Sequence, residues 1–98
     1  MTIEIKRTAE ETTIDIIGRL DTTTAPELDK TINEDLADVK FLVLNCKRLD
    51  YISSAGLRVL LSTQKKMQKV GAMRLVNVRE EVMEVFEMTG FSDILTIE

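Results

Sequence analysis

The stretch FLVL at residues 41–44 is a continuous apolar run that decides the fold class. A half-buried strand alternates polar and apolar residues, whereas a strand covered by helices on both faces is apolar throughout. The run therefore predicts a central parallel strand. Asn45 and Cys46 end it, and residues 47–52 are predicted to form a loop that leads to the next helix.

Two strands and one helix are predicted before this run. Isoleucines alternate with charged residues over 2–8, which is typical of an edge strand with one wet face. Residues 12–18 are rich in β-branched side chains, and the short link between the two segments favours an antiparallel hairpin. Thr24 followed by Glu27 forms a capping-box pattern that predicts a helix ending near Leu36. Its predicted inner face is Ala25, Leu28, Ile32 and Leu36.

Two helices and two strands are predicted after the run. Helical spacing of apolar residues over 57–70 predicts a helix that ends at Gly71. A strand over 73–78, a helix over 79–89 and a short strand over 94–97 follow. Asn77 with Glu80 is the predicted cap of the last helix, whose predicted inner face is Val82, Val85, Phe86 and Met88 or Thr89.

The predicted fold is a single α/β domain over residues 1–98 with the order β-β-α-β-α-β-α-β. Strands that alternate with helices imply a mostly parallel sheet, here of four to five strands with an antiparallel N-terminal edge strand and three helices. Functional groups of such sheets gather where strands lead into helices. The loops 21–24 and 50–56 both have this position, so we expect them at one end of the sheet.

Composition excludes several kinds of chemistry. The chain has no His and one Cys, which excludes His-dependent nucleophilic catalysis, an internal disulfide and Cys-rich or His-based metal sites. We therefore expect no enzyme activity, cofactor or metal. The chain has a net charge of −4, so it lacks the excess of basic residues that is typical of a nucleic-acid binder. No apolar run reaches the roughly 20 residues that cross a bilayer, so we expect no membrane insertion and a cytoplasmic location.

Several polar residues have ordinary explanations from residue type alone. A Ser at position 53 or 54 can cap the following helix, and Asp21 and Asp50 suit turns or caps. Cys46 is expected to fill space beside the central strand, and Tyr51 to pack with its hydroxyl in water. The outer side of the 57–70 helix is a cationic stripe that could simply be a solvated face: Arg58, Ser62, Lys65, Lys66 and Lys69.

Three segments carry a resemblance to a known family. Residues 49–61, Leu-Asp-Tyr-Ile-Ser-Ser-Ala-Gly-Leu-Arg-Val-Leu-Leu, resemble the signature loop and helix start of the STAS domain family, the anti-sigma-factor antagonists. Residues 18–28 resemble its first signature block, and 88–91 its last-helix ending. The element order matches over nearly the whole chain. The family's final helix has no counterpart before Glu98.

The resemblance implies a phosphorylation site. The family's phosphorylated Ser falls on Ser54, and Ser53, where the family often has Asp, is the second candidate. The implied neighbourhood of the site is Asp21, Thr22, Asp50 and Gly56. The implied partner-binding residues are Ser53, Leu57, Arg58, Ser62 and Lys65.

The resemblance also implies a function in bacterial transcription regulation. The unphosphorylated protein would bind an anti-sigma factor that is itself a serine kinase, and so release a sigma factor. Phosphorylation of Ser54 would end this binding, and a PP2C-type phosphatase would reset it. We expect a monomer or weak dimer. One alternative is a non-phosphorylated STAS scaffold or accessory subunit of a lipid transporter. Another is a small enzyme that uses Asp21 and Asp50 as an acid–base pair.

Overall fold

One mixed sheet of five strands organises the domain. The computed structural model describes all 98 residues. The strands are β1 (Thr2–Arg7), β2 (Thr12–Leu20), β3 (Phe41–Asn45), β4 (Leu49–Ile52) and β5 (Ala72–Val76). β1 pairs antiparallel with β2, whereas β2–β3, β3–β5 and β2–β4 are parallel pairs. The predicted mostly parallel sheet with an antiparallel N-terminal edge strand is therefore confirmed.

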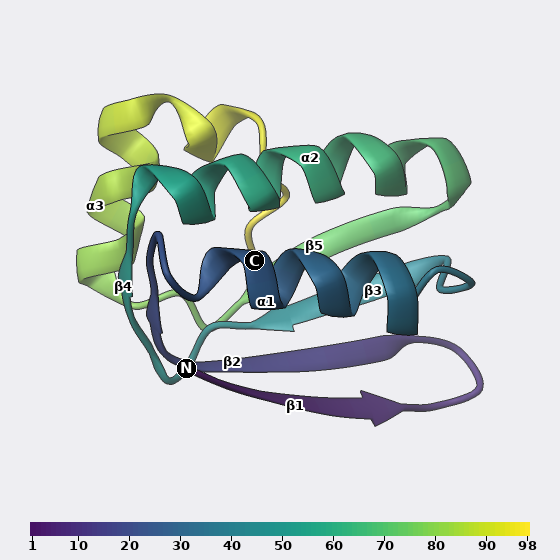
Figure 1. Cartoon of the computed structure of the whole chain (residues 1–98). Helices are drawn as coiled ribbons and strands as arrows, with labels where there is room; N and C mark the ends of the chain where they lie inside the picture. Colours follow the sequence, from purple (N-terminus) through teal and green to yellow (C-terminus); the bar gives the residue numbers. More distant parts are fainter.

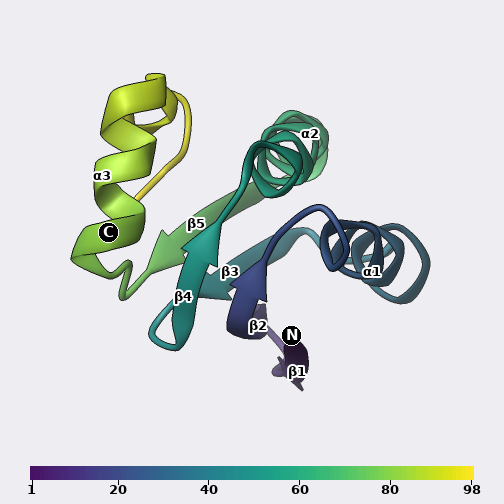
Figure 2. The same ribbon diagram turned by 60° about the vertical axis from the view of Figure 1, so that its left-hand side comes forward.

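Three helices accompany the sheet, as predicted. They are α1 (Ala25–Lys30), which continues as a π-helical turn (Thr31–Asp35), α2 (Ser54–Val70) and α3 (Glu80–Thr89). α1 and α2 lie side by side over one face of the sheet, while α3 lies apart from them and packs against β4 (Figures 1 and 2). None of the helices has the length and apolar character needed to cross a membrane.

The main core lies between the sheet and the pair α1 and α2. Ile14 and Leu44 are register partners on β2 and β3, and both are fully buried. The whole predicted inner face of the first helix is also buried, which confirms its register. The run at 41–44 is less uniform than predicted, because Phe41 at its start is 53% exposed. Its other three residues are buried.

The segment predicted as a loop over 47–52 contains strand β4. Its backbone pairs with the second half of β2, where Gly18 N–H donates to the Arg48 carbonyl at 2.9 Å. Leu49 and Ile52 are buried and the two residues between them are exposed. This pattern lacks the alternation of a regular strand, because the register shifts between the pairs Gly18–Leu49 and Arg19–Tyr51 and leaves Asp50 as an extra residue in β4. The loop prediction was wrong for this reason.

The C-terminal segment is less regular than predicted. Residues 94–97 form no strand of their own, and only an isolated parallel bridge joins Ile97 to Leu75. Gly90, at φ +83°, ends α3 and is followed by a 3-10 turn at Phe91–Asp93, which leaves few residues for pairing. Met88 was predicted as a possible inner residue of this helix, but it is 86% exposed.

Two predicted helix caps are absent. Thr24 makes no capping bond to the first turn of α1, and its hydroxyl instead donates to the Arg19 carbonyl at 2.8 Å. Asn77 does not cap α3, which begins after Arg79 without a side-chain cap. Asn77 has a left-handed backbone, at φ +57°, and its amide donates to Asn45 Oδ1 at 3.0 Å. Both residues are polar turn formers whose side chains bond to strand residues instead, Arg19 on β2 and Asn45 on β3.

Candidate functional site

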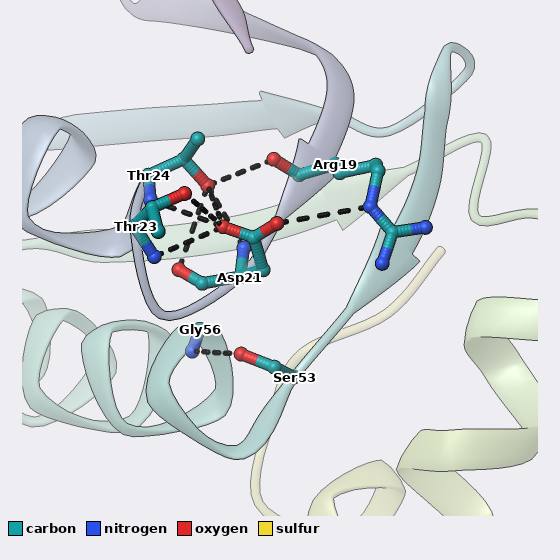
Figure 3. Close-up of polar contacts among 6 residues, drawn as sticks. All are labelled: Arg19, Asp21, Thr23, Thr24, Ser53 and Gly56. Atoms are coloured by element: carbon teal, nitrogen blue, oxygen red, sulfur yellow. Dashed lines mark hydrogen bonds and ion pairs between the residues drawn. The ribbon is translucent and has the colours of Figure 1, made fainter.

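Two strand ends bring the predicted loops together. Leu20 ends β2 and Ile52 ends β4, and the two residues are register partners in the sheet. The Ser53 N–H donates to the Leu20 carbonyl at 2.9 Å, so the pairing continues one residue beyond β4. Asp21 and Ser53 therefore leave the sheet side by side, and the expected meeting of the two loops is confirmed (Figure 3).

The turn after β2 is organised around the Asp21 carboxylate. Its Oδ1 accepts hydrogen bonds from the Thr23 hydroxyl at 2.8 Å, the Thr23 N–H at 3.0 Å and the Thr24 N–H at 3.2 Å (Figure 3). The Thr23 hydroxyl is the main cause that lowers the pKa of Asp21 below its ordinary value, while partial desolvation opposes this. Asp21 is therefore a charged residue that caps its own turn through Oδ1.

Arg19 adds a cation to the same turn. Its Nε lies 3.7 Å from Asp21 Oδ2, and its guanidinium lies over the Tyr51 ring, 4.0 Å from the centroid. Tyr51 is 42% exposed, so the expected partly wet Tyr is confirmed, although its ring contacts a cation. The sequence reading did not single out Arg19. Its position opposite Tyr51 depends on the β2–β4 pairing, which was not predicted.

The two serines have different surroundings. Ser53 has an extended backbone and is the N-cap of α2, with its hydroxyl accepting from the Gly56 N–H at 3.5 Å. Ser54 is the first residue of α2, three residues before the predicted helix start, and its side chain is exposed. The capping explanation therefore holds for Ser53, while Ser54 keeps a hydroxyl that faces solvent.

Gly56 allows the start of α2 to approach the sheet. A Cβ at this position would lie 2.7 Å from Leu20 Cγ, 2.9 Å from Ile52 Cγ1 and 3.0 Å from the Leu20 carbonyl oxygen. Both neighbouring side chains are buried and have little room to move. Because Gly56 has no side chain, the start of α2 and its two serines can lie close to the end of β2.

The outer face of α2 is cationic, as predicted. Arg58, Ser62, Lys65 and Lys69 are exposed, while Lys66 is half-buried and donates to Asn33 Oδ1 on the neighbouring helical segment at 3.0 Å. Leu57 had been assigned to the partner-binding set, but it is 6% exposed and belongs to the core. A partner on this surface would meet the residues on either side of it.

The remaining candidates lie around these loops. Thr22 is exposed at the tip of the Asp21 turn. Asp50 is exposed on β4, and its Oδ1 accepts from Arg79 Nη1 at 2.6 Å, which joins β4 to the start of α3. Asp21 and Asp50 therefore have separate cationic partners, Arg19 and Arg79.

No group of three or more His, Cys, Asp or Glu residues is arranged to hold a metal ion. Cys46 is 1% exposed, which confirms its expected place in the core. Burial raises the pKa of its thiol to about 12. The polar groups at the end of the sheet are thus hydroxyls, one organised carboxylate and cations.

This fold and this pair of loops define a class of small α/β domain, and a family profile identifies the class. The STAS domain profile matches residues 2–98. The chain belongs to the STAS domain family.

Named relatives share one description. The anti-sigma-B factor antagonist of Bacillus subtilis is 29% identical over 97% of this chain and 88% of its own length. BtrV of Bordetella bronchiseptica, which has the provisional name of anti-sigma factor antagonist, is 47% identical over 57% of this chain. That match spans 49% of BtrV.

Solved structures agree with the fold. An anti-sigma factor antagonist from Mycobacterium paratuberculosis superimposes with a TM-score of 0.88 at 23% identity, over 98% of this chain and 83% of that one. The phosphorylated form of the Bacillus cell fate determinant SpoIIAA superimposes with a TM-score of 0.75 at 20% identity, over 99% and 91%. Likeness at these identities shows the fold.

Proposed function

We propose that this STAS domain is an anti-sigma factor antagonist whose binding is switched by phosphorylation of Ser54. The observation that carries the proposal is the exposed Ser54 side chain at the start of α2, beside the organised Asp21 turn. The family membership and the names of the relatives support the class of partner.

In the proposed cycle, the unphosphorylated domain binds an anti-sigma factor with serine kinase activity, and a sigma factor is released. The kinase then transfers a phosphoryl group to Ser54, and a PP2C-type phosphatase later removes it. This chain catalyses neither step, and the cycle operates in the cytoplasm. The chain supplies a hydroxyl and a docking surface.

The proposed docking surface combines the Ser53–Ser54 turn with the outer face of α2. Arg58 and Lys65 are exposed there and form no ion pair within the chain. Such cations complement an acidic partner surface and speed its association. We therefore propose contacts from Ser53, Arg58, Ser62 and Lys65, with Leu57 supporting them from the core.

Phosphorylation would weaken such a contact by adding charge inside it. A phosphoryl group brings about −1.5 to −2 charges at neutral pH. An interface that excludes water cannot accommodate this charge without a matched partner. A loss of about 2.8 kcal/mol of binding free energy corresponds to a roughly 100-fold weaker complex. The switch therefore requires no refolding of the domain.

Kinase treatment tests the proposal. The domain is incubated with ATP and a candidate anti-sigma factor kinase, and its mass is measured. We expect one added phosphoryl group in the wild type and none in Ser54→Ala. Ser92→Ala, in the 3-10 turn after α3 and outside the proposed docking surface, is the control that should still be modified. Full modification of Ser54→Ala, or loss of modification in Ser92→Ala alone, would contradict the assignment.

A second candidate function is a scaffold that is never phosphorylated, such as an accessory subunit of a lipid transporter. The observation that favours it is Ser53, which occupies the position where the family often has Asp. Capture of partners from cells by the wild type and by Ser54→Asp separates the two functions. A switch predicts that Ser54→Asp loses its main partner, whereas a scaffold predicts the same partners for both.

A further inference from the structure

We propose that Arg58 is the internal partner of the phosphoryl group on Ser54. The inference rests on the proposed phosphorylation of that residue and goes beyond it by naming the side chain that binds the phosphoryl group. In the unphosphorylated domain the Arg58 guanidinium is free for a carboxylate of the partner. In the phosphorylated domain the same guanidinium pairs with the phosphoryl oxygens.

The spacing along α2 brings the two side chains together. Ser54 and Arg58 both lie within α2, one at its first residue and the other four residues later. Side chains at i and i+4 of a helix lie on the same face, with about 5–6 Å between their Cβ atoms. Both are exposed, whereas Gly56, Leu57 and Leu60 are buried. This burial fixes the rotation of the helix and turns the pair toward solvent.

Arg58 is available for the contact. The chain contains eight ion pairs, and none of them involves Arg58. The other cations near the strand ends are engaged: Arg19 contacts Asp21 and Tyr51, and Arg79 contacts Asp50. Along α2, the next cation on the outer face is Lys65, roughly 16 Å from Ser54 along the helix axis. Arg58 is thus the free cation one helical turn from Ser54.

The direction and the chemistry of the pair are both favourable. An anion on the N-terminal side of a cation at i, i+4 is the better of the two orders in a helix. A phosphoryl group offers three acceptor oxygens, and a guanidinium can donate two parallel hydrogen bonds to them. Lysine at this position would provide a point charge without this geometry.

The pairing gives phosphorylation a second effect on the docking surface. Arg58 is the first cation of the exposed row Arg58, Lys65 and Lys69. When the phosphoryl group pairs with this guanidinium, Arg58 can no longer bind an acidic partner. The negative charge of the phosphoryl group repels the same partner. The partner would then meet a row that begins two turns further along α2.

Titration of the phosphorylated domain tests the inference without a kinase or a partner. Phosphoserine is installed at position 54 during synthesis of the whole chain, and its second ionisation is followed by 31P NMR. Three forms are compared: otherwise unmodified, Arg58→Gln and the matched control Lys65→Gln. We expect the phosphoserine pKa to be about 0.3 lower with Arg58 present than in Arg58→Gln, and unchanged in Lys65→Gln. The pKa difference should shrink in 1 M salt, because the screening length there is about 3 Å and the attraction between the two charges is weakened.

Equal pKa values with and without Arg58 would overturn the inference. An equal rise in Arg58→Gln and Lys65→Gln would also overturn it, because that result indicates the general field of the helix. Since both positions are exposed, neither substitution threatens folding. Failure of a kinase to modify Ser54 would refute the proposed function and leave the titration result intact, so the two failures are distinguishable.

Discussion

The two loops at this end of the sheet differ in how fully their polar groups are satisfied. In the turn after β2, Asp21 Oδ1 accepts hydrogen bonds from both the hydroxyl and the N–H of Thr23, and Thr24 adds further bonds. In the turn after β4, Ser53 accepts one long bond of 3.5 Å, and the Ser54 side chain is exposed. The polar groups of the first loop bond mainly to one another, whereas the second loop leaves the Ser54 hydroxyl without a partner in the chain.

The difference suggests a division of labour between the loops. A turn held by several hydrogen bonds to one carboxylate oxygen keeps one conformation, and it can serve as a fixed neighbour for a residue that is modified. Ser54, whose hydroxyl makes no hydrogen bond within the chain, can be modified without loss of a structural hydrogen bond. Three predictions, ordered from the largest expected effect to the smallest, test whether the loops differ in this way.

Gly56→Ala should have the largest effect on stability. Alanine in place of glycine normally stabilises a helix by roughly 0.5–1 kcal/mol. Here the new Cβ would lie 3.0 Å or less from Leu20 and Ile52, and such overpacking typically costs about 1–3 kcal/mol. We therefore expect a lower free energy of unfolding, measured by urea denaturation. Ser62→Ala on the exposed face of α2 is the control, and a stabilised Gly56→Ala would contradict the close approach.

Asp21→Ala should have an intermediate effect, because it removes the acceptor that organises the first turn. The folded-state pKa of Asp21 lies below its ordinary value, so the carboxylate stabilises the fold above the unfolded pKa. This contribution is present at neutral pH and is lost as the pH falls through the folded pKa, below 3.8.

Asp21→Asn separates the charge of this carboxylate from its hydrogen bonds. At pH 7 we expect the urea midpoint to decrease in the order wild type, Asp21→Asn, Asp21→Ala. As the pH falls through the folded-state pKa, which lies below 3.8, the wild type and Asp21→Asn should converge, because the wild-type carboxyl then becomes neutral. A gap between these two that stays constant with pH would show that the charge of Asp21 contributes nothing.

Ser53→Ala and Ser54→Ala should have the smallest effects, and they should differ from each other. Loss of the Ser53 cap should cost about 0.5–1 kcal/mol, at the low end for N-caps because its hydrogen bond is long. Loss of the exposed Ser54 hydroxyl should change the free energy of unfolding by less than about 0.5 kcal/mol. Thermal unfolding of both variants measures the difference. A larger cost for Ser54→Ala would mean that Ser54 supports the fold.

Much of the candidate site could be predicted from the sequence, because strand-to-helix loops in a parallel sheet share one end. The meeting of the 21–24 and 50–56 loops followed from element order alone. The role of Asp21 as a cap for its own turn could not be separated from that of Thr24, since both residue types suit that position. Arg19 was missed because only the pairing of β2 with β4 brings it over Tyr51.

The fold could be predicted where the hydrophobic periodicity was strong. The prediction failed where tertiary contacts determine the local structure. The inner face predicted for the first helix repeats at helical spacing, and all four of its residues, which extend from α1 through the π-helical turn to Leu36, are buried. The irregular burial of β4 depends on its pairing with β2, in which Asp50 is an extra residue between the pairs Gly18–Leu49 and Arg19–Tyr51, and residues 49–52 alone do not reveal this pairing. The 94–97 segment has strand-like composition but makes a single bridge, so composition alone overstated its regularity.

The buried thiol of Cys46 makes the domain convenient for labelling. With 1% of its surface exposed and a pKa of about 12, Cys46 stays protonated and shielded in the folded state. A second cysteine, introduced by Ser62→Cys on the outer face of α2, would therefore react alone with a maleimide dye. A fluorophore there would report partner arrival at this surface while the native cysteine stays in place.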